Sequence, residues 1–229
     1  MQKNTYSKHQ PDLNRLPGVI TTIVSQKKNA HRFSIFIDDQ FFIGISESTL
    51  IEFDLGKGDQ LSPDLFREIK DFEERVTVKS YCLRLLSRRD HARKELYDKA
   101  RRKDYNPGVI NDVLDELEEK EYINAAAFAR AFAQDKRRFN NWGPIKIKMA
   151  LKKKGISGSQ AERAVESSFD EVNEKDLFSD LVFKQKQRFL REEDLFKRKK
   201  KIFDYLSRKG YRQGDIMKYL DDLMDMVRR

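Results

Sequence analysis

The stretch Leu151-Lys152-Lys153-Lys154-Gly155-Ile156 decides the fold, because two related stretches occur elsewhere in the chain. Ala100-Arg101-Arg102-Lys103-Asp104-Tyr105 lies 51 positions before it, and Leu206-Ser207-Arg208-Lys209-Gly210-Tyr211 lies 55 positions after it. Each stretch has an apolar residue, a mostly basic run, a turn residue and a large apolar residue. Repeats of this period are typical of modular arrays, in which one unit of several helices is copied along the chain.

The repeat extends on both sides of the anchors Tyr105, Ile156 and Tyr211. Apolar residues recur nine positions before, five positions after and nine positions after each anchor: Leu96, Ile147 and Ile202; Ile110, Ala161 and Ile216; Leu114, Val165 and Leu220. We expect these positions and the anchors to form the cores of three related units. An exposed tyrosine could instead stack on nucleic-acid bases, but the isoleucine at the same position favours packing.

Turn signals divide the chain after about residue 75 into nine expected helices, three in each repeat. They are expected at 76–88, 91–103, 107–120, 125–139, 143–154, 158–170, 174–191, 194–208 and 212–227. Residues 19–46 differ, because β-branched and aromatic runs separated by short polar breaks predict an antiparallel meander. The expected fold class is mainly α, a tandem array of three three-helix repeats with a small N-terminal antiparallel β meander.

The expected organisation follows from these boundaries. It comprises a flexible tail (1–17), a β meander with a short helix (18–61), a connecting helix (62–75), helical repeat 1 (76–123), helical repeat 2 (124–172) and helical repeat 3 (173–229). Arrays of this kind usually offer a long surface to a partner rather than a catalytic pocket.

Basic charge is phased to the repeat. The 229 residues are 37% charged with a net charge of +9, and the excess lies in the second part of the chain. Residues 1–74 hold 9 Lys and Arg against 12 Asp and Glu, whereas residues 75–229 hold 38 against 26. The middle helix of each repeat is the basic one. Such helices could meet a polyanion or an acidic protein face, or could pair with acidic neighbours inside the array.

Several function classes are not supported by the residues. The single cysteine, Cys82, allows no disulfide within the chain and fits a reducing, cytoplasmic setting. No apolar run resembles a secretory signal or a membrane span. The three histidines are widely separated, and no metal-ligand spacing, phosphate loop or nucleophile motif occurs. We therefore expect a monomeric, non-enzymatic protein with no catalytic residues, cofactor, metal or membrane contact.

The candidate contact residues are basic, apart from the single tryptophan. They are Arg88, Arg89, Arg93, Lys94, Lys136, Arg137, Arg138, Trp142, Lys146, Lys152, Lys153, Lys154, Lys197, Lys199, Lys200 and Lys201. The runs 152–154 and 197–201 look too dense for every lysine to be paired internally. The cluster at 136–138 could instead complement a helix C-terminus. Trp142 could be a structural anchor at a helix start or an exposed interface aromatic.

These motifs resemble the RecX family of recombinase regulators. The resemblance covers roughly residues 76–225 and rests on the segments 81–90 with 93–96, 112–117 with 122–124 and 128–132, and 142–147 with 151–156. The meander and residues 56–61 are similar to an N-terminal extension that some members carry. Repeat 1 departs from the pattern, since Lys103-Asp104 stands where a Lys-Gly pair is usual.

The resemblance implies a function that composition could not give. RecX proteins bind the RecA recombinase, mostly as its filament on single-stranded DNA. They inhibit its ATPase, strand-exchange and co-protease activities, which places them in DNA recombination, repair and the SOS response. Contact with single- and double-stranded DNA is also expected. The alternatives are a direct DNA-binding module with a basic stripe, or a general helical-repeat adaptor.

Overall fold

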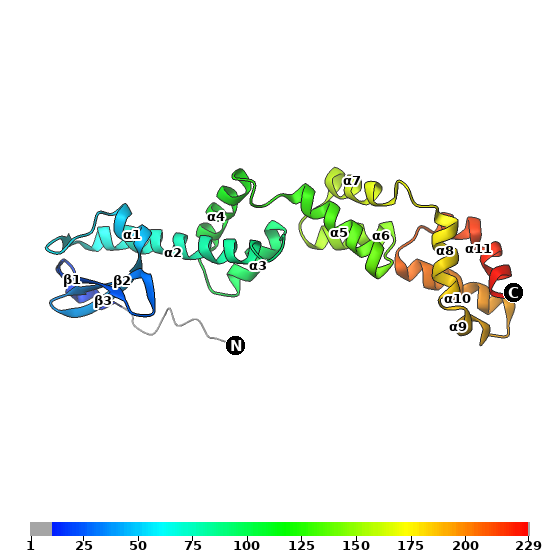
Figure 1. Ribbon diagram of the computed structural model, residues 1–229, viewed down its shortest axis with the longest axis horizontal. Helices are drawn as coiled ribbons and strands as arrows, with labels where there is room; N and C mark the ends of the chain where they lie inside the picture. Colours follow the sequence, from blue (N-terminus) through cyan, green and yellow to red (C-terminus); the bar gives the residue numbers. More distant parts are fainter. Residues whose placement is uncertain (1–10, 229) are drawn as a thin grey trace. The chain divides into compact units, whose positions relative to one another are not determined.

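The structure is a computed structural model that describes residues 11–228 (Figure 1). The chain falls into two compact units, which are considered separately. Unit 1 holds the chain up to Arg89 together with Leu96–Glu119. Unit 2 holds Asp90–Glu95 and the chain from Lys120 onward. The expected fold class is confirmed: a small antiparallel sheet is followed by tandem helical repeats.

Unit 1 begins with the predicted meander. Strands β1 (Gly18–Gln26), β2 (Asn29–Ile37) and β3 (Gln40–Ser46) pair antiparallel in sequence order. A short strand, β4 (Gln60–Leu61), pairs with the other edge of β1, so the described sheet has the order β3-β2-β1-β4. The sequence did not predict β4, because two residues are too few to show an alternating pattern.

The segment before the sheet is more ordered than the expected flexible tail. Residues 1–10 of that predicted tail lie outside the described residues. A 3-10 helix, η1 (Leu13–Arg15), follows them, and the Asp12 carboxylate caps it by accepting a hydrogen bond from the Asn14 backbone N–H at 3.1 Å. Leu16 packs against the core of the sheet. This part of the predicted tail therefore forms a capped helical turn that packs on the sheet through Leu16.

One face of the sheet is covered by two helices, α1 (Glu47–Glu52) and the first half of α2 (Pro63–Leu86). Ser46 caps the predicted short helix α1, and Ser62 caps α2, which has Pro63 in its first turn. Phe66 of α2 meets Phe42 of β3 edge to face, with ring centroids 5.2 Å apart. The sheet and α2 therefore share one hydrophobic core.

Helix α2 corrects the predicted elements at 62–75 and 76–88, which are one continuous helix of 24 residues. No glycine or proline interrupts the sequence after Pro63, and no turn forms there. The first half of α2 packs on the sheet, and its second half packs against α4 (Pro107–Glu119) of repeat 1, whose middle helix is α3 (Arg93–Arg101). The meander is thus joined to repeat 1 within unit 1.

Glu73 ties α2 to the sheet at the middle of this helix. Its carboxylate accepts hydrogen bonds from the Arg32 guanidinium (2.7 Å), the Ser46 backbone N–H (2.9 Å) and the Thr49 hydroxyl (2.5 Å). The side chains of Arg32 and Glu73 are only 16% and 12% exposed. Groups removed from water in this way depend on their partners, because an unpaired buried charge is costly.

We predict that Glu73→Ala destabilises unit 1 by about 3 kcal/mol, since it removes the carboxylate that balances the buried charge of Arg32 and that accepts hydrogen bonds from Ser46 and Thr49. Urea unfolding followed by circular dichroism measures the change. Glu68→Ala, on the exposed side of the same helix, is the matched control and should change stability little. Equal effects of the two substitutions would contradict the role given to Glu73.

Repeat 1 places Cys82 in its interior. Cys82 lies on α2 and is fully buried, and its burial raises the pKa of the thiol to about 11. The thiol is therefore protonated at neutral pH and acts as a small apolar side chain.

At the surface of repeat 1, an ion pair joins two of its helices: Lys79 of α2 pairs with Glu116 of α4 at 2.6 Å.

Unit 2 contains two helical cores. In repeat 2, α5 (Ala125–Asn140), α6 (Pro144–Lys153) and α7 (Gly158–Phe169) enclose one of them. In repeat 3, α8 (Glu174–Phe183), α9 (Lys186–Leu190), α10 (Leu195–Lys209) and α11 (Gln213–Arg228) enclose the other. The helix predicted at 174–191 is wrong in one respect, since Gln185 leaves the helical region and separates α8 from α9. After this break, Phe189 is buried beside Tyr205, with ring centroids 5.8 Å apart.

The repeat period located the cores correctly. All nine apolar positions flanking the anchors are buried. Ile156 and Tyr211 are each 4% exposed, whereas Tyr105 is only half-buried. Repeat 1 therefore differs from the other two at one anchor.

Candidate partner-binding surface

The repeats of unit 2 meet through the ends of their middle helices. The backbone N–H of Gly143 donates to the Lys209 carbonyl at 2.7 Å, and that of Ile145 donates to the Gly210 carbonyl at 3.0 Å. The start of α6 is thus completed by the carbonyls at the end of α10. This contact gives hydrogen-bond partners to both helix ends, because the first N–H groups and the last C=O groups of a helix have no partners within the helix. We call this arrangement a junction.

Close backbone approach explains the glycines of the junction. Gly210 has φ 93°, and a Cβ atom there would lie 2.6 Å from the Lys146 backbone nitrogen. A Cβ on Gly143 would lie 2.5 Å from the Gly210 carbonyl carbon and oxygen. No side chain fits at either position, so the contact requires two glycines.

Trp142 belongs to the same junction. The ring is half-buried against the core of repeat 2, and two ammonium groups lie over it, those of Lys136 (5.3 Å from the ring centroid) and Lys146 (4.7 Å). The Lys146 ammonium also donates to the Arg208 carbonyl at 3.4 Å. These three candidates from the sequence therefore lie together, where each contributes to packing by cation–π contact.

A second junction joins the start of α3 to the end of α6 inside unit 2. Lys154 forms an ion pair with Glu95, and its ammonium lies over the rings of Phe128 (5.8 Å) and Phe132 (5.3 Å). Gly155 has φ 84° and faces Lys94, whose Cβ atom would lie 3.3 Å from an added Cβ. Lys154 and Lys94 thus both take part in the contact between repeats.

The lysine run of α10 is partly paired. Lys199 pairs with Asp221 at 2.5 Å and Lys201 with Glu192 at 2.6 Å. The hydrogen bond from Lys201 lowers the pKa of the Glu192 carboxyl. Lys197 and Lys200 are exposed and have no ion pair with any of the described residues. The expectation that the run could not be fully paired therefore agrees with these positions.

The exposed face of α6 has a different character. Ile145 and Met149 are 45% and 59% exposed, and Lys152 and Lys153 follow on the next turn, also exposed. Within residues 11–228, neither lysine has a partner. We call these four residues the outer stripe of α6. Spacings of three and four residues place them side by side on the helix surface.

Sequence reasoning missed the apolar part of the outer stripe. In the repeat register, Ile145 corresponds to Lys94 and Lys200, and Met149 corresponds to Asp98 and Asp204. The fold therefore accepts charged residues at both positions, so burial does not explain Ile145 and Met149. Comparing the exposed positions of the three repeats, rather than only their core positions, would have revealed them.

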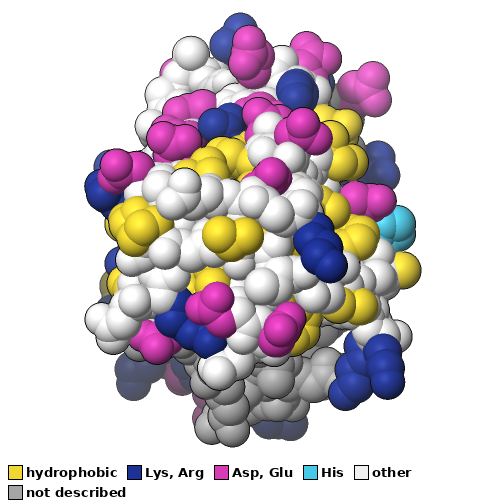
Figure 2. All heavy atoms as spheres, turned by 90° about the vertical axis from the view of Figure 1, so that its left-hand side faces the viewer, with side chains coloured by type: hydrophobic (Ala, Val, Ile, Leu, Met, Phe, Trp, Pro, Cys, Tyr) yellow, Lys and Arg dark blue, Asp and Glu magenta, His cyan; other side chains and the backbone are white. Residues whose placement is uncertain are grey.

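The remaining candidates are dispersed. Arg88 and Arg89 follow the end of α2 and are exposed, and Arg93 is half-buried in the first turn of α3. The Arg137 guanidinium lies 6.0 Å from the ring of Phe169, whereas Arg138 is exposed near the end of α5. Figure 2 shows acidic and basic side chains interspersed with hydrophobic ones among the described residues of the face that it views. Over the described part of the chain, no cluster of His, Cys, Asp and Glu could hold a metal ion, and none of the helices has the length and apolar character that a membrane span requires.

Comparison with known proteins agrees with this architecture. Three family profiles match in order: the N-terminal domain of regulatory protein RecX at residues 18–62, the first three-helix domain of RecX at 79–117, and the second at 124–165. Regulatory protein RecX of Clostridioides difficile is 31% identical over 210 residues, which cover 91% of this chain and 97% of that protein. The chain belongs to the RecX family.

Other RecX proteins support the assignment and the fold. Regulatory protein RecX of Leuconostoc mesenteroides is 32% identical over 83% of this chain and 70% of its own length. A crystal structure of regulatory protein RecX superposes with a TM-score of 0.71, at 22% identity, over 90% of this chain and 99% of that one. A crystal structure of RecX from Lactobacillus salivarius gives a TM-score of 0.55 over 66% of this chain. These structures show that the fold is that of RecX proteins.

Proposed function

We propose that this RecX-family protein binds the RecA recombinase, chiefly as its filament on single-stranded DNA, and inhibits ATP hydrolysis, strand exchange and co-protease activity. Membership of a family of regulatory proteins is the observation that carries this proposal. The repeats provide surfaces rather than reactive groups, so the mechanism would be steric and electrostatic. A regulator lodged in the groove of a filament can block duplex entry or the change of shape that accompanies ATP turnover.

The outer stripe of α6 is the best-supported contact surface for this function. It combines exposed apolar area with two unpaired lysines, and interfaces commonly surround apolar contacts with polar ones. The matching surface on the recombinase would present an apolar contact flanked by carboxylates. Lys146 and Lys154 are less suitable, because both are engaged inside the protein.

The test is to titrate the full chain into a RecA ATPase assay on single-stranded DNA. We expect ATP hydrolysis to fall as the protein approaches stoichiometry with its binding sites, and the protein to sediment with the filaments. Full ATPase activity at that level, with no protein in the filament pellet, would refute the proposal.

Direct binding to DNA is the second candidate, favoured by the unpaired lysines on α6 and α10. Binding through phosphates weakens steeply with salt, in proportion to the contacts made. Fluorescence anisotropy of a labelled single strand, measured across a salt series without RecA, tests it. A steep salt slope would support a DNA contact, whereas no binding at low salt would exclude it.

A further inference from the structure

The middle helix of repeat 1, α3, ends in the same way as the middle helices of repeats 2 and 3. Among the described residues, however, no other helix start contacts the end of α3. In repeats 2 and 3 the lysine before the turn reaches the preceding repeat: Lys154 pairs with Glu95, and Lys209 donates to the Asn140 carbonyl at 3.1 Å. The corresponding residue of repeat 1 is Lys103. It is exposed, and no described residue pairs with it.

The backbone at this end has the form that builds a junction elsewhere. Asp104 adopts φ 62°, in the same left-handed region as Gly155 (84°) and Gly210 (93°). The next residue, Tyr105, is half-buried, whereas its counterparts Ile156 and Tyr211 are each 4% exposed. The end of α3 is therefore a junction surface that lacks its second half.

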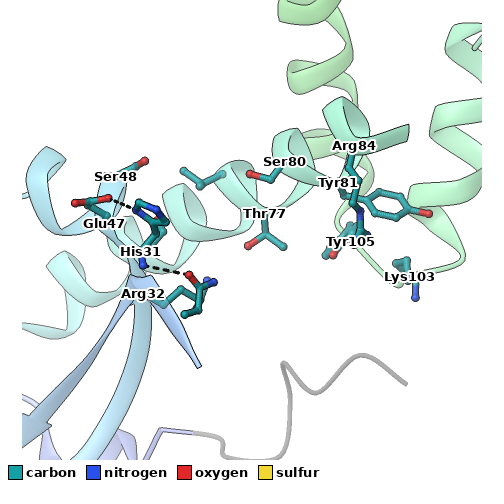
Figure 3. Close-up of a pocket in the computed structure, with 13 residues that line it drawn as sticks. His31, Arg32, Glu47, Ser48, Thr77, Ser80, Tyr81, Arg84, Lys103 and Tyr105 are labelled. Atoms are coloured by element: carbon teal, nitrogen blue, oxygen red, sulfur yellow. Dashed lines mark hydrogen bonds and ion pairs between the residues drawn. The ribbon is translucent and has the colours of Figure 1, made fainter. Parts of the chain in front are cut away.

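A pocket of about 500 Å³ lies in front of this surface, within unit 1 (Figure 3). Tyr81 and Arg84 of α2 and Lys103 and Tyr105 form one side of it, and the region of His31, Glu47 and Ser48 forms the other. The Arg84 guanidinium lies 5.5 Å from the ring centroid of Tyr81. The pocket thus offers two aromatic rings beside two cations.

The start of α10 faces no other middle helix among the described residues and is capped by its own Asp194 carboxylate, which accepts hydrogen bonds from the Phe196 and Lys197 backbone N–H groups at 2.8 and 3.0 Å. The end of α6 faces the start of α3, and the end of α10 faces the start of α6. Among the described residues, no middle helix ends against the start of α10. Leu195 and Phe196 there are 49% and 78% exposed, and the carboxylates of Glu193 and Asp194 precede them.

We propose that these two ends bind each other between copies of the chain, with the start of α10 of one copy entering the pocket beside α3 of the next. Phe196 would pack against Tyr81 and Tyr105, and the carboxylates at the helix start would face Arg84 and Lys103. The polarity is that of the junctions inside the chain, in which the start of one middle helix meets the end of another. Because two different surfaces meet, the contact is heterologous and leaves one end of each copy available, so it can extend from copy to copy.

This association requires neither RecA nor DNA, so it does not rest on the proposed function. It differs from the monomer expected from sequence, because unfilled junctions leave no signal in the sequence alone. If the proposed function also holds, the contact would allow successive copies to follow one another along a filament.

Sedimentation velocity of the full chain at low salt tests the proposal. We expect the mean mass to rise with concentration and to pass that of a dimer. Lys103→Glu places a negative charge in the pocket, and Phe196→Asp removes the aromatic ring that would enter it. Each variant alone should therefore associate at least about tenfold more weakly than the unmodified chain. Lys27→Glu, an exposed lysine in the β1–β2 turn, is the charge-matched control for the first variant.

A mixture of the two blocked variants gives the decisive result. Each retains one intact end, so the mixture should form a pair and stop at the mass of a dimer. Three results would overturn the proposal: a monomer at every concentration, a mass that stops at the dimer for the unmodified chain, or blocked variants that associate as the unmodified chain does. Binding of RecA that is lost on Lys103→Glu while the chain stays monomeric would assign the pocket to another occupant.

Discussion

Replacing Gly210 by alanine should destabilise unit 2 by about 3 kcal/mol or more, since two costs coincide. Alanine is strained at φ 93°, and its methyl group would enter the backbone of α6 at Lys146. The atoms that it meets belong to the first turn of a helix and cannot rotate away. The end of α10 would have to withdraw, which would also break the hydrogen bonds from Gly143 and Ile145.

Thermal and urea unfolding followed by circular dichroism measure this effect. Gly214→Ala is the matched control, because a Cβ atom at that position would meet nothing within 4 Å and its φ is not positive. The control should change stability by no more than about 0.5 kcal/mol. Gly143→Ala should resemble Gly210→Ala, and the double substitution should cost less than the sum, because both act on one contact. Similar stability of Gly210→Ala and Gly214→Ala would contradict the close packing inferred for the junction.

Reversing the charge of the outer stripe should remove most of the proposed inhibition of RecA. In the double variant Lys152→Glu, Lys153→Glu, two unpaired cations become anions at a surface expected to meet carboxylates. Like charges brought together at an interface are strongly unfavourable. We expect half-inhibition of the RecA ATPase to require at least about tenfold more protein. Ile145→Asp with Met149→Asp should act in the same direction by removing the apolar contact.

The control carries the same charge change elsewhere. Lys27 and Lys28 are adjacent, exposed lysines in the turn between β1 and β2, and their double replacement by glutamate should inhibit as the unmodified chain does. Unchanged circular dichroism and melting would show that the outer-stripe variants are folded. If both lysine pairs weaken inhibition equally, the effect is one of overall charge and the stripe is not the contact surface.

Sequence periodicity predicted the core well, because core positions recur in register. Leu96, Ile147 and Ile202 are fully buried, as their common place in the repeat required. Periodicity could not predict the junctions, since these join residues far apart in the chain, such as Gly143 with Lys209 and Glu95 with Lys154. The sequence did contain a partial signal, because glycine recurs at 155 and 210 and aspartate replaces it at 104.

The candidate contacts were harder to predict than the core. From charge density alone, Lys154, Lys199 and Lys201 were candidates of the same kind as Lys152 and Lys153. In the structure the first three form ion pairs within the protein, whereas the last two do not. Lys199 forms an ion pair with Asp221, 22 residues away, and Lys201 forms one with Glu192, which precedes the start of α10. A pairing that depends on how two helices pack cannot be read from local composition. The apolar residues of the outer stripe carry no periodic signal, because the other repeats have charged residues at the same positions.

The continuity of α2 determines where this protein can be cut. The family profiles end at residue 62 and resume at 79, which suggests a separable N-terminal module. Cleavage at that boundary would remove Phe66 and Ile69 from the core beneath the sheet and would leave Leu61 uncovered. An expression fragment meant to isolate the sheet should therefore retain α2 at least through Glu73. A fragment meant to isolate the repeats should begin after Glu73, where α2 no longer packs against the sheet.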